Sequence, residues 1–275
     1  VVVPALDGAG LAALRARIDA ALLARRTPSP ILKAALQVVA DAQGDVEAYI
    51  AAFSASELKQ PWAGAQIGRR LLTAGRVEDA LAALARSTPP TGARTLLSGV
   101  HEWEDVFLDA LEADGQGELA QDLRWQAFET RLAADRLRAF LKRLPDFDDV
   151  EAEDKAMAHA LVFPHFSDAL RFFSEWPAGA KAAELILARA PEIEPRRAEV
   201  NESAAQLLAA RHPLAASLLL RAMVADTLRW ARADRYKDAQ RQLAEIGALA
   251  DQVADWGGFE THEAFLARLA QIRRG

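Results

Sequence analysis

The stretch WAGAQIGRRLLTAGRVEDALAALARSTPP, residues 62–90, decides the fold class. Its apolar residues recur every three to four positions, as in amphipathic helices, and Gly75 separates two such runs. Gly68 and Ala80 carry little or no side chain, so two helices can approach closely here, while Leu84 fills the seam between them. The stretch therefore predicts an antiparallel helical hairpin with a tight turn at Gly75.

The same periodicity continues along the rest of the chain, and no segment alternates with the two-residue period of a strand. Helices are predicted at 8–25, 30–42, 45–53, 61–74, 77–87, 102–113, 116–131, 133–144, 149–162, 166–176, 178–190, 196–210, 213–232, 235–254 and 260–272. Turn signals such as TPSP, STPPTG and WPAG separate them, and such short connections make successive helices antiparallel neighbours. We therefore predict an all-α stack of antiparallel helical hairpins, an α-solenoid of about 13–16 helices with no sheet.

Part of the hairpin pattern recurs later in the chain. In HFSDALRFF (165–173) and RYKDAQRQL (235–243), an aromatic residue, an alanine and a large apolar residue follow one another after three and four positions. This spacing is typical of the second helix of a tetratricopeptide repeat. We expect one continuous helical-repeat domain over residues 1–275, with the segment 87–99 as its hinge. The chain begins with Val1 rather than Met, so we expect it to be a fragment of a longer protein.

Composition narrows the classes of function. The sequence contains no cysteine, which excludes disulfides and thiolate catalysis and fits a cytoplasmic protein. Its net charge of −6 argues against a broad nucleic-acid-binding face, which needs clustered Lys and Arg. No apolar run reaches the roughly 18 residues of a membrane span. We therefore expect neither nucleic acid nor membrane as a partner.

Several strings of the chain are distinctive, among them ALQVVADAQGDVEAYIA (35–51), LRAFLKRLPDFDDVEAED (137–154) and FFSEWPAGAKAAELILARA (172–190). Together they resemble a bacterial family known as domain of unknown function 6880. The resemblance covers most of the chain and implies a helical, tetratricopeptide-like protein. It implies no activity, cofactor or catalytic residue.

The acidic segment PDFDDVEAED, residues 145–154, has three interpretations: a metal site, an acidic recognition patch, or the charged start of a helix. Asp146, Asp148 and Asp149 could supply oxygen ligands, but the segment lacks the glycine that a calcium-binding loop needs for its sharp turn. Acids in the first turn of a helix satisfy free amide groups and the helix dipole. We favour the helix start, with Asp148 or Asp149 as its cap.

The sequence contains no motif that places a nucleophile beside a general base, and none that places metal ligands at the spacing of a known metal site. HEWED (101–105), for example, lacks the second histidine of a zinc-protease helix. We therefore expect no cofactor and lean towards a non-enzymatic protein. The alternative is a hydrolase or nucleic-acid-processing enzyme that uses Asp146, Asp148 and Asp149 with a bound metal and a distant histidine.

Arginine and aromatic residues mark the candidate binding site. Arg, Trp and Tyr are enriched at interface hot spots, although aromatics at helical spacing also pack in cores. The candidate residues for protein binding are Arg124, Trp125, Arg229, Arg232 and Tyr236. We expect them to be partly exposed on one shared face. On this basis the sequence predicts a scaffold or adaptor that binds another protein or a peptide segment.

Overall fold

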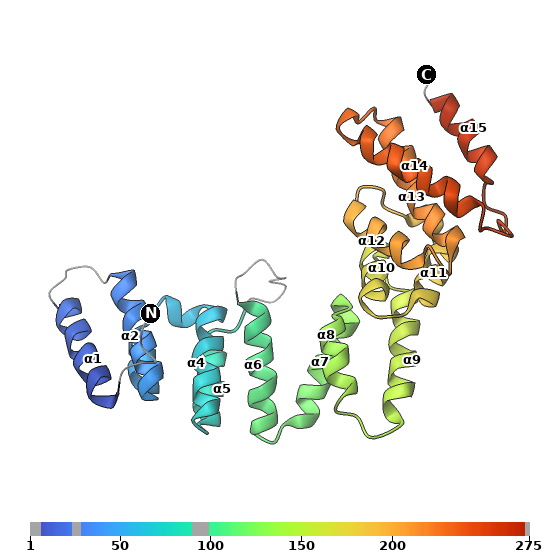
Figure 1. Ribbon diagram of the computed structural model, residues 1–275. Coiled ribbons are helices and arrows are strands. Elements are labelled where there is room, and N and C mark those ends of the chain that lie inside the picture. Colours follow the sequence, from blue (N-terminus) through green and yellow to red (C-terminus); the bar gives the residue numbers. More distant parts are fainter. Residues whose placement is uncertain (1–6, 24–28, 90–98, 273–275) are drawn as a thin grey trace. The chain divides into compact units, whose positions relative to one another are not determined.

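The computed structural model describes residues 7–23, 29–89 and 99–272. Every regular element within these residues is a helix and none is a strand, which confirms the all-α prediction (Figure 1). Contacts within the chain group its residues into two compact units, Val1–Leu123 and Arg124–Gly275. None of the described helices combines the length and the apolar character needed to cross a bilayer.

The first unit is built from consecutive helices that pack on one another. It contains α1 (Gly8–Leu23), α2 (Pro30–Gln43), α3 (Val46–Ala51), the 3-10 helix η2 (Glu57–Lys59), α4 (Pro61–Thr73), α5 (Val77–Arg86) and α6 (Val100–Ala113). Helix α1 packs on α2, and α4 packs on both α5 and α6. Helix α7 (Gly117–Arg131) includes the boundary between the two units.

The two helices predicted within residues 62–90 are present as α4 and α5, which pack on each other. Gly75 adopts a left-handed conformation (φ +73°), and the next amide, of Arg76, donates a 2.8 Å hydrogen bond to the Leu71 carbonyl. These are the features of a glycine-terminated helix. A Cβ atom at Gly68 would lie 3.0 Å from Val106 Cγ1 and 3.2 Å from Leu84 Cγ. Gly68 therefore admits α6 as well as α5 to the surface of α4.

A second close contact joins the ends of these three helices. Ser87 is fully buried, and its hydroxyl donates to the Ala83 carbonyl at 3.1 Å. Trp103 Nε1 on α6 donates to Ser87 Oγ at 3.1 Å, and Gly64 on α4 faces the same serine. Most of the predicted hinge at 87–99, residues 90–98, lies outside the described residues, but its first residue is a packed part of the core.

The second unit surrounds a central helix, α13. Besides the end of α7 it contains α8 (Ala134–Leu141), α9 (Asp148–Leu161), α10 (Phe166–Glu175), α11 (Gly179–Ala188), the 3-10 helix η3 (Ala190–Glu192), α12 (Ala198–Leu208), α13 (Pro213–Arg229), the 3-10 helix η4 (Ala233–Arg235), α14 (Tyr236–Ala250) and α15 (His262–Ile272). Helix α13 contacts α11, α12, α14 and α15. Phe128, Phe172 and Phe173 are at most 1% exposed and form an aromatic part of the core.

The two recurrences of the hairpin pattern differ in the structure. Phe166, Ala169 and Phe173 are all buried in α10, as the pattern predicts. In the later copy Ala239 is buried, but Tyr236 is 45% exposed and does not serve as a core aromatic residue. Tyr236 is therefore available at the surface of the second unit.

Candidate functional site

Of the first two candidate binding residues, the structure buries Arg124 in the core and leaves Trp125 half-buried against it. Arg124 is only 2% exposed, so it cannot serve as an exposed anchor as predicted. The reason is its position one helical turn before Phe128 on α7, on the face that is turned inward. Trp125 is half-buried: its ring lies 5.5 Å from that of Phe128 and 5.2 Å from that of Phe140 (centroid distances), and Lys155 Nζ lies 4.6 Å from its centroid.

The other three candidates lie together where α13 ends and α14 begins. Arg229 is the last residue of α13, Arg232 precedes η4, and Tyr236 is the first residue of α14. Trp230, between them, is 58% exposed, and the guanidinium carbon of Arg229 lies 5.8 Å from its ring centroid. With Arg235, these residues form what we call the arginine–aromatic surface: Arg229, Trp230, Arg232, Arg235 and Tyr236.

The backbone of this surface is held by a tight turn. Ala231 adopts a left-handed conformation (φ +47°) that glycine usually supplies, and the Arg232 amide donates to the Thr227 carbonyl at 3.0 Å. The turn directs the Arg232 side chain back along α13, where Nη2 lies 3.8 Å from Asp226 Oδ2. The flanking Trp230 remains exposed. The strained alanine thus fixes where the exposed ring and the arginines lie.

The charges of the surface are only partly balanced. Arg232 has a distant ion pair with Asp226, whereas Arg229 and Arg235 have no carboxylate within 4.0 Å among the described residues. Arginine binds carboxylates through two parallel N–H groups and also stacks on aromatic rings. The surface can therefore hold a carboxylate and a flat ring at once.

The acidic segment behaves as a helix start, but not through the predicted cap. Helix α9 begins at Asp148, and its first turn holds Asp148, Asp149 and Glu151. The capping position is Phe147, which has φ +78° and whose side chain makes no capping hydrogen bond. Asp149 Oδ1 accepts only the neighbouring Val150 amide, at 3.0 Å. The prediction that Asp148 or Asp149 caps the helix is therefore wrong, because the left-handed Phe147 occupies that position.

The aspartates of the metal-site alternative do not assemble with other ligands in the described part of the chain. Asp146, Asp148 and Asp149 are all exposed. Across residues 7–23, 29–89 and 99–272, no three His, Asp or Glu side chains come close enough together to hold a metal ion. The enzyme alternative thus gains no metal site from these residues.

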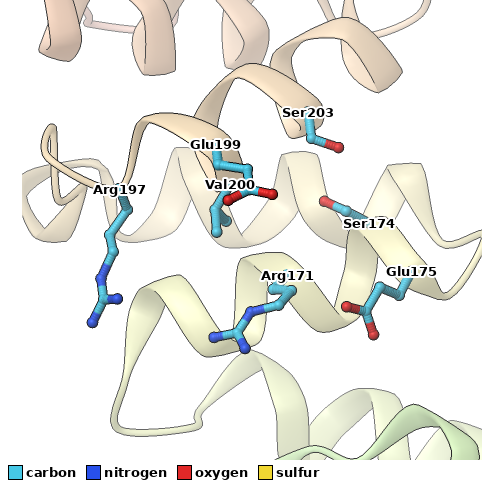
Figure 2. A pocket seen from close by; sticks show the side chains of 7 residues that line it. All are labelled: Arg171, Ser174, Glu175, Arg197, Glu199, Val200 and Ser203. Atoms are coloured by element: carbon cyan, nitrogen blue, oxygen red, sulfur yellow. The ribbon is translucent and has the colours of Figure 1, made fainter.

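A polar groove between α10 and α12 is a site that the sequence did not suggest. It has a volume of about 470 Å³ and is lined by Arg171, Ser174, Glu175, Arg197, Glu199, Val200 and Ser203. Figure 2 shows Arg197 at the left of the groove, Glu175 at the right, and Arg171 below and between them. No local motif links these residues, because they come from two helices that meet only in the fold.

The groove has polar groups but no catalytic pair. Arg171 donates to Asp168, and Arg197 Nε lies 3.6 Å from Glu194 Oε2, so both cations already have carboxylate neighbours. The Ser174 hydroxyl donates to the Leu170 carbonyl at 2.8 Å, so its proton is not directed at a base. The groove can hydrogen-bond a polar ligand, but it has no activated nucleophile.

Comparison with known proteins identifies the family. Residues 7–274 match the model of a family of unknown function, DUF6880, and the chain belongs to that family. This confirms the resemblance that the sequence strings carry. No curated protein and no solved structure matches the chain.

Proposed function

We propose that this chain is a non-enzymatic scaffold that binds a segment of another protein through the arginine–aromatic surface. The observation that carries the proposal is exposure: Trp230 and Tyr236 are 58% and 45% exposed, whereas Trp103 and Trp176 are each 8% exposed. Exposed Trp and Tyr beside Arg are the residue types that dominate interface hot spots. They also lie on the ends of two packed helices, so binding would require little reorganisation.

The chemistry of the surface indicates the kind of partner. Arg229 and Arg235 offer guanidinium groups to carboxylates, and the Trp230 ring offers a flat apolar face. The partner segment that fits is therefore acidic and contains an aromatic or other large apolar residue. Lysine-rich segments would be repelled.

The repeat architecture and the location belong to the same proposal. We infer that the helices form a tetratricopeptide-like solenoid of antiparallel hairpins, because α4 with α5, α12 with α13, and α13 with α14 pack as consecutive pairs. Such solenoids present extended surfaces to protein partners. We place the protein in the bacterial cytoplasm, because disulfides are rare in that reducing compartment and the sequence contains no cysteine.

The test is affinity purification of the full-length protein from its native cells, followed by mass spectrometry. We expect one recurrent protein partner, lost with Trp230→Ala and with Arg232→Glu. Since Trp230 is largely exposed, its removal should change the free energy of unfolding by less than about 0.5 kcal/mol. Circular dichroism and the melting temperature check that the variants remain folded.

The matched control is Arg211→Glu. Arg211 is an exposed arginine just before α13, and the 17 residues of that helix place it about 25 Å from Arg229. This variant reverses the same charge and should keep the partner. Equal loss of the partner in Arg211→Glu would show a general charge effect, and recovery of a nucleic acid or a metabolite without any protein would contradict the proposal.

A further inference from the structure

The most unusual side chain in the second unit is Arg221, in the middle of α13. It is 4% exposed, yet it has no salt bridge with any described carboxylate. Its Nη1 donates to the Glu260 carbonyl at 2.5 Å, whereas Nε and Nη2 are buried without a hydrogen-bond partner. A buried cation normally has a counter-ion, because desolvation of an unpaired charge is costly. Burial accordingly lowers the pKa of Arg221, an effect that Glu260 partly offsets.

The two unpartnered nitrogens form the edge of the guanidinium that binds carboxylates side-on. Three other arginines of this chain use that same Nε–Nη2 edge: Arg70 holds Asp41, Arg189 holds Glu192, and Arg268 holds Glu260. In the last case the Nε and Nη2 distances are both 2.9 Å. Arg221 presents the identical fork, but in a buried position and with no carboxylate in it.

The carboxylates close in sequence to this site are engaged elsewhere. Glu260 gives only its backbone carbonyl to Arg221, since its carboxylate is held by Arg268. Glu263 lies in the exposed first turn of α15, where its own backbone amide and Thr261 hold its pKa below the usual range. Neither side chain makes an ion pair with Arg221.

Two aromatic rings lie against the guanidinium of Arg221. The Trp256 ring centroid lies 4.4 Å and the Phe265 centroid 4.9 Å from the guanidinium carbon of Arg221. One further polar atom of α13 is also buried without a partner: Ser217 Oγ, one helical turn earlier on the same face of the helix. The rings cover the guanidinium but accept none of its hydrogen bonds, so the unmatched Nε–Nη2 edge could still be satisfied by an anion that accepts both N–H groups.

The segment over this site is suited to opening. It joins α14 to α15, and it contains Gly257 and Gly258, both in left-handed conformations (φ +53° and +85°). Within the described residues its single hydrogen bond to α13 is the one from Arg221 to the Glu260 carbonyl. Because Trp256 belongs to this segment, movement of the segment would take its ring away from the Arg221 guanidinium without unfolding a helix.

We propose that the Nε–Nη2 edge of Arg221 binds a carboxylate group supplied by another molecule, admitted by displacement of Trp256. This site is separate from the arginine–aromatic surface and does not depend on the proposed function. The carboxylate could belong to a small organic acid or to the free C-terminus of a peptide, since both present the same planar pair of oxygens. Both sources are distinguished by the probes below.

The experiment is an NMR titration of the whole chain that follows the arginine Nε–H signals, with the Arg221 signal assigned by its loss in Arg221→Lys. Sodium acetate is the first probe, and sodium chloride at equal ionic strength is its reference. The second probe pair is one short peptide with a free C-terminus and the same peptide amidated. We expect a saturable shift of the Arg221 signal with acetate, and tighter binding of the free peptide than of the amide if the source is a C-terminus.

Two variants make the result decisive. Arg221→Lys keeps the charge but loses the fork, and we expect at least about a tenfold weaker affinity for acetate by calorimetry. Arg70→Gln removes an arginine whose fork already holds Asp41, and we expect unchanged affinity. If Arg221→Lys fails to fold, the Arg221 Nε–H signal is assigned in the parent chain by through-bond triple-resonance experiments, and the titration of the parent chain then tests the proposal by itself. An Arg221 signal that does not move with any carboxylate, or equal binding by Arg221→Lys, would overturn the proposal.

Discussion

Gly64→Ala is expected to destabilise the first unit by about 2 kcal/mol, because Gly64 is the point where three helices meet. A Cβ atom at this position would lie 1.8 Å from Ser87 Oγ and 2.7 Å from Ser87 Cβ. Rotation of the hydroxyl relieves the first clash but not the second, so the end of α5 must shift. That shift would disturb the hydrogen bond from Trp103 Nε1 to Ser87 Oγ.

The magnitude follows from three contributions. Overpacking a filled core costs about 1–3 kcal/mol, and a disturbed buried hydrogen bond adds about 1 kcal/mol. The better helix propensity of alanine returns about 1 kcal/mol. The sum is about 1–3 kcal/mol, opposite in sign to the effect of the same substitution at an open helical position.

The assay is urea denaturation at 25 °C followed by far-UV circular dichroism, with the m-value checked for each variant. Gly247→Ala is the matched control, because Gly247 lies inside α14 with no atom within 4 Å of an added Cβ. That variant should gain about 0.5–1 kcal/mol. Ser87→Gly removes both clashing atoms, so Gly64→Ala should cost about 1–2 kcal/mol less in its presence. A Gly64→Ala midpoint at or above that of the parent would refute this packing argument.

Three further predictions, made with four substitutions, concern other parts of the chain. A hydrogen bond from Lys33 holds the pKa of Glu57 at about 2, below its value in the unfolded chain. Ionised Glu57 therefore contributes stability above about pH 4.5, and this contribution is lost as the pH falls towards 2. Glu57→Gln should remove this pH dependence from the urea midpoint, an effect of no more than about 1 kcal/mol because Glu57 is partly exposed. Phe172→Ala should cost about 3–5 kcal/mol in the same assay, because its fully buried ring packs in the aromatic core; a loss below about 1 kcal/mol would show that this core is misplaced. Changing Asp148 and Asp149 to Asn should lower the free energy of unfolding by about 0.3–1 kcal/mol each, because both carboxylates interact favourably with the helix dipole. Magnesium or a chelator should leave the melting temperature of the parent chain unchanged. A melting temperature that rises with magnesium in the parent chain but not in the double variant would favour the enzyme alternative.

The positions of the helices could be predicted because their boundaries are set locally. The range predicted as 61–74 is observed as Pro61–Thr73, with proline at its start and the left-handed Gly75 just beyond its end. Where the local signal was missing, the prediction overshot. The predicted helix 213–232 ends at Arg229 in the structure, because Ala231 adopts a left-handed conformation. No glycine marks this turn in the sequence, so the helix end could not be predicted.

Exposure of the charged residues could not be predicted in the same way. Arg124 and Arg229 occur in similar Arg-Trp pairs, yet the first arginine is buried and the second is exposed. Helical periodicity gives a residue's angle around its own helix, but not which neighbouring helix covers that angle. The long arginine stem also suits either environment. The candidate binding site therefore divided in the structure, and only its members around the end of α13 remained together.

The same limit explains why Arg221 was not among the predicted site residues. In the sequence it interrupts an apolar run and suggests nothing more than a solvated position on the helix. Its character depends on Trp256 and Phe265, which reach it from segments more than thirty residues away. The same edge of the Arg70 guanidinium binds the Asp41 carboxylate, so a carboxylate is the ligand expected for the unmatched edge of Arg221. Arg70, Arg189 and Arg268 each hold a carboxylate in this fork whereas the buried Arg221 does not, and the proposal assigns that position to a carboxylate from another molecule.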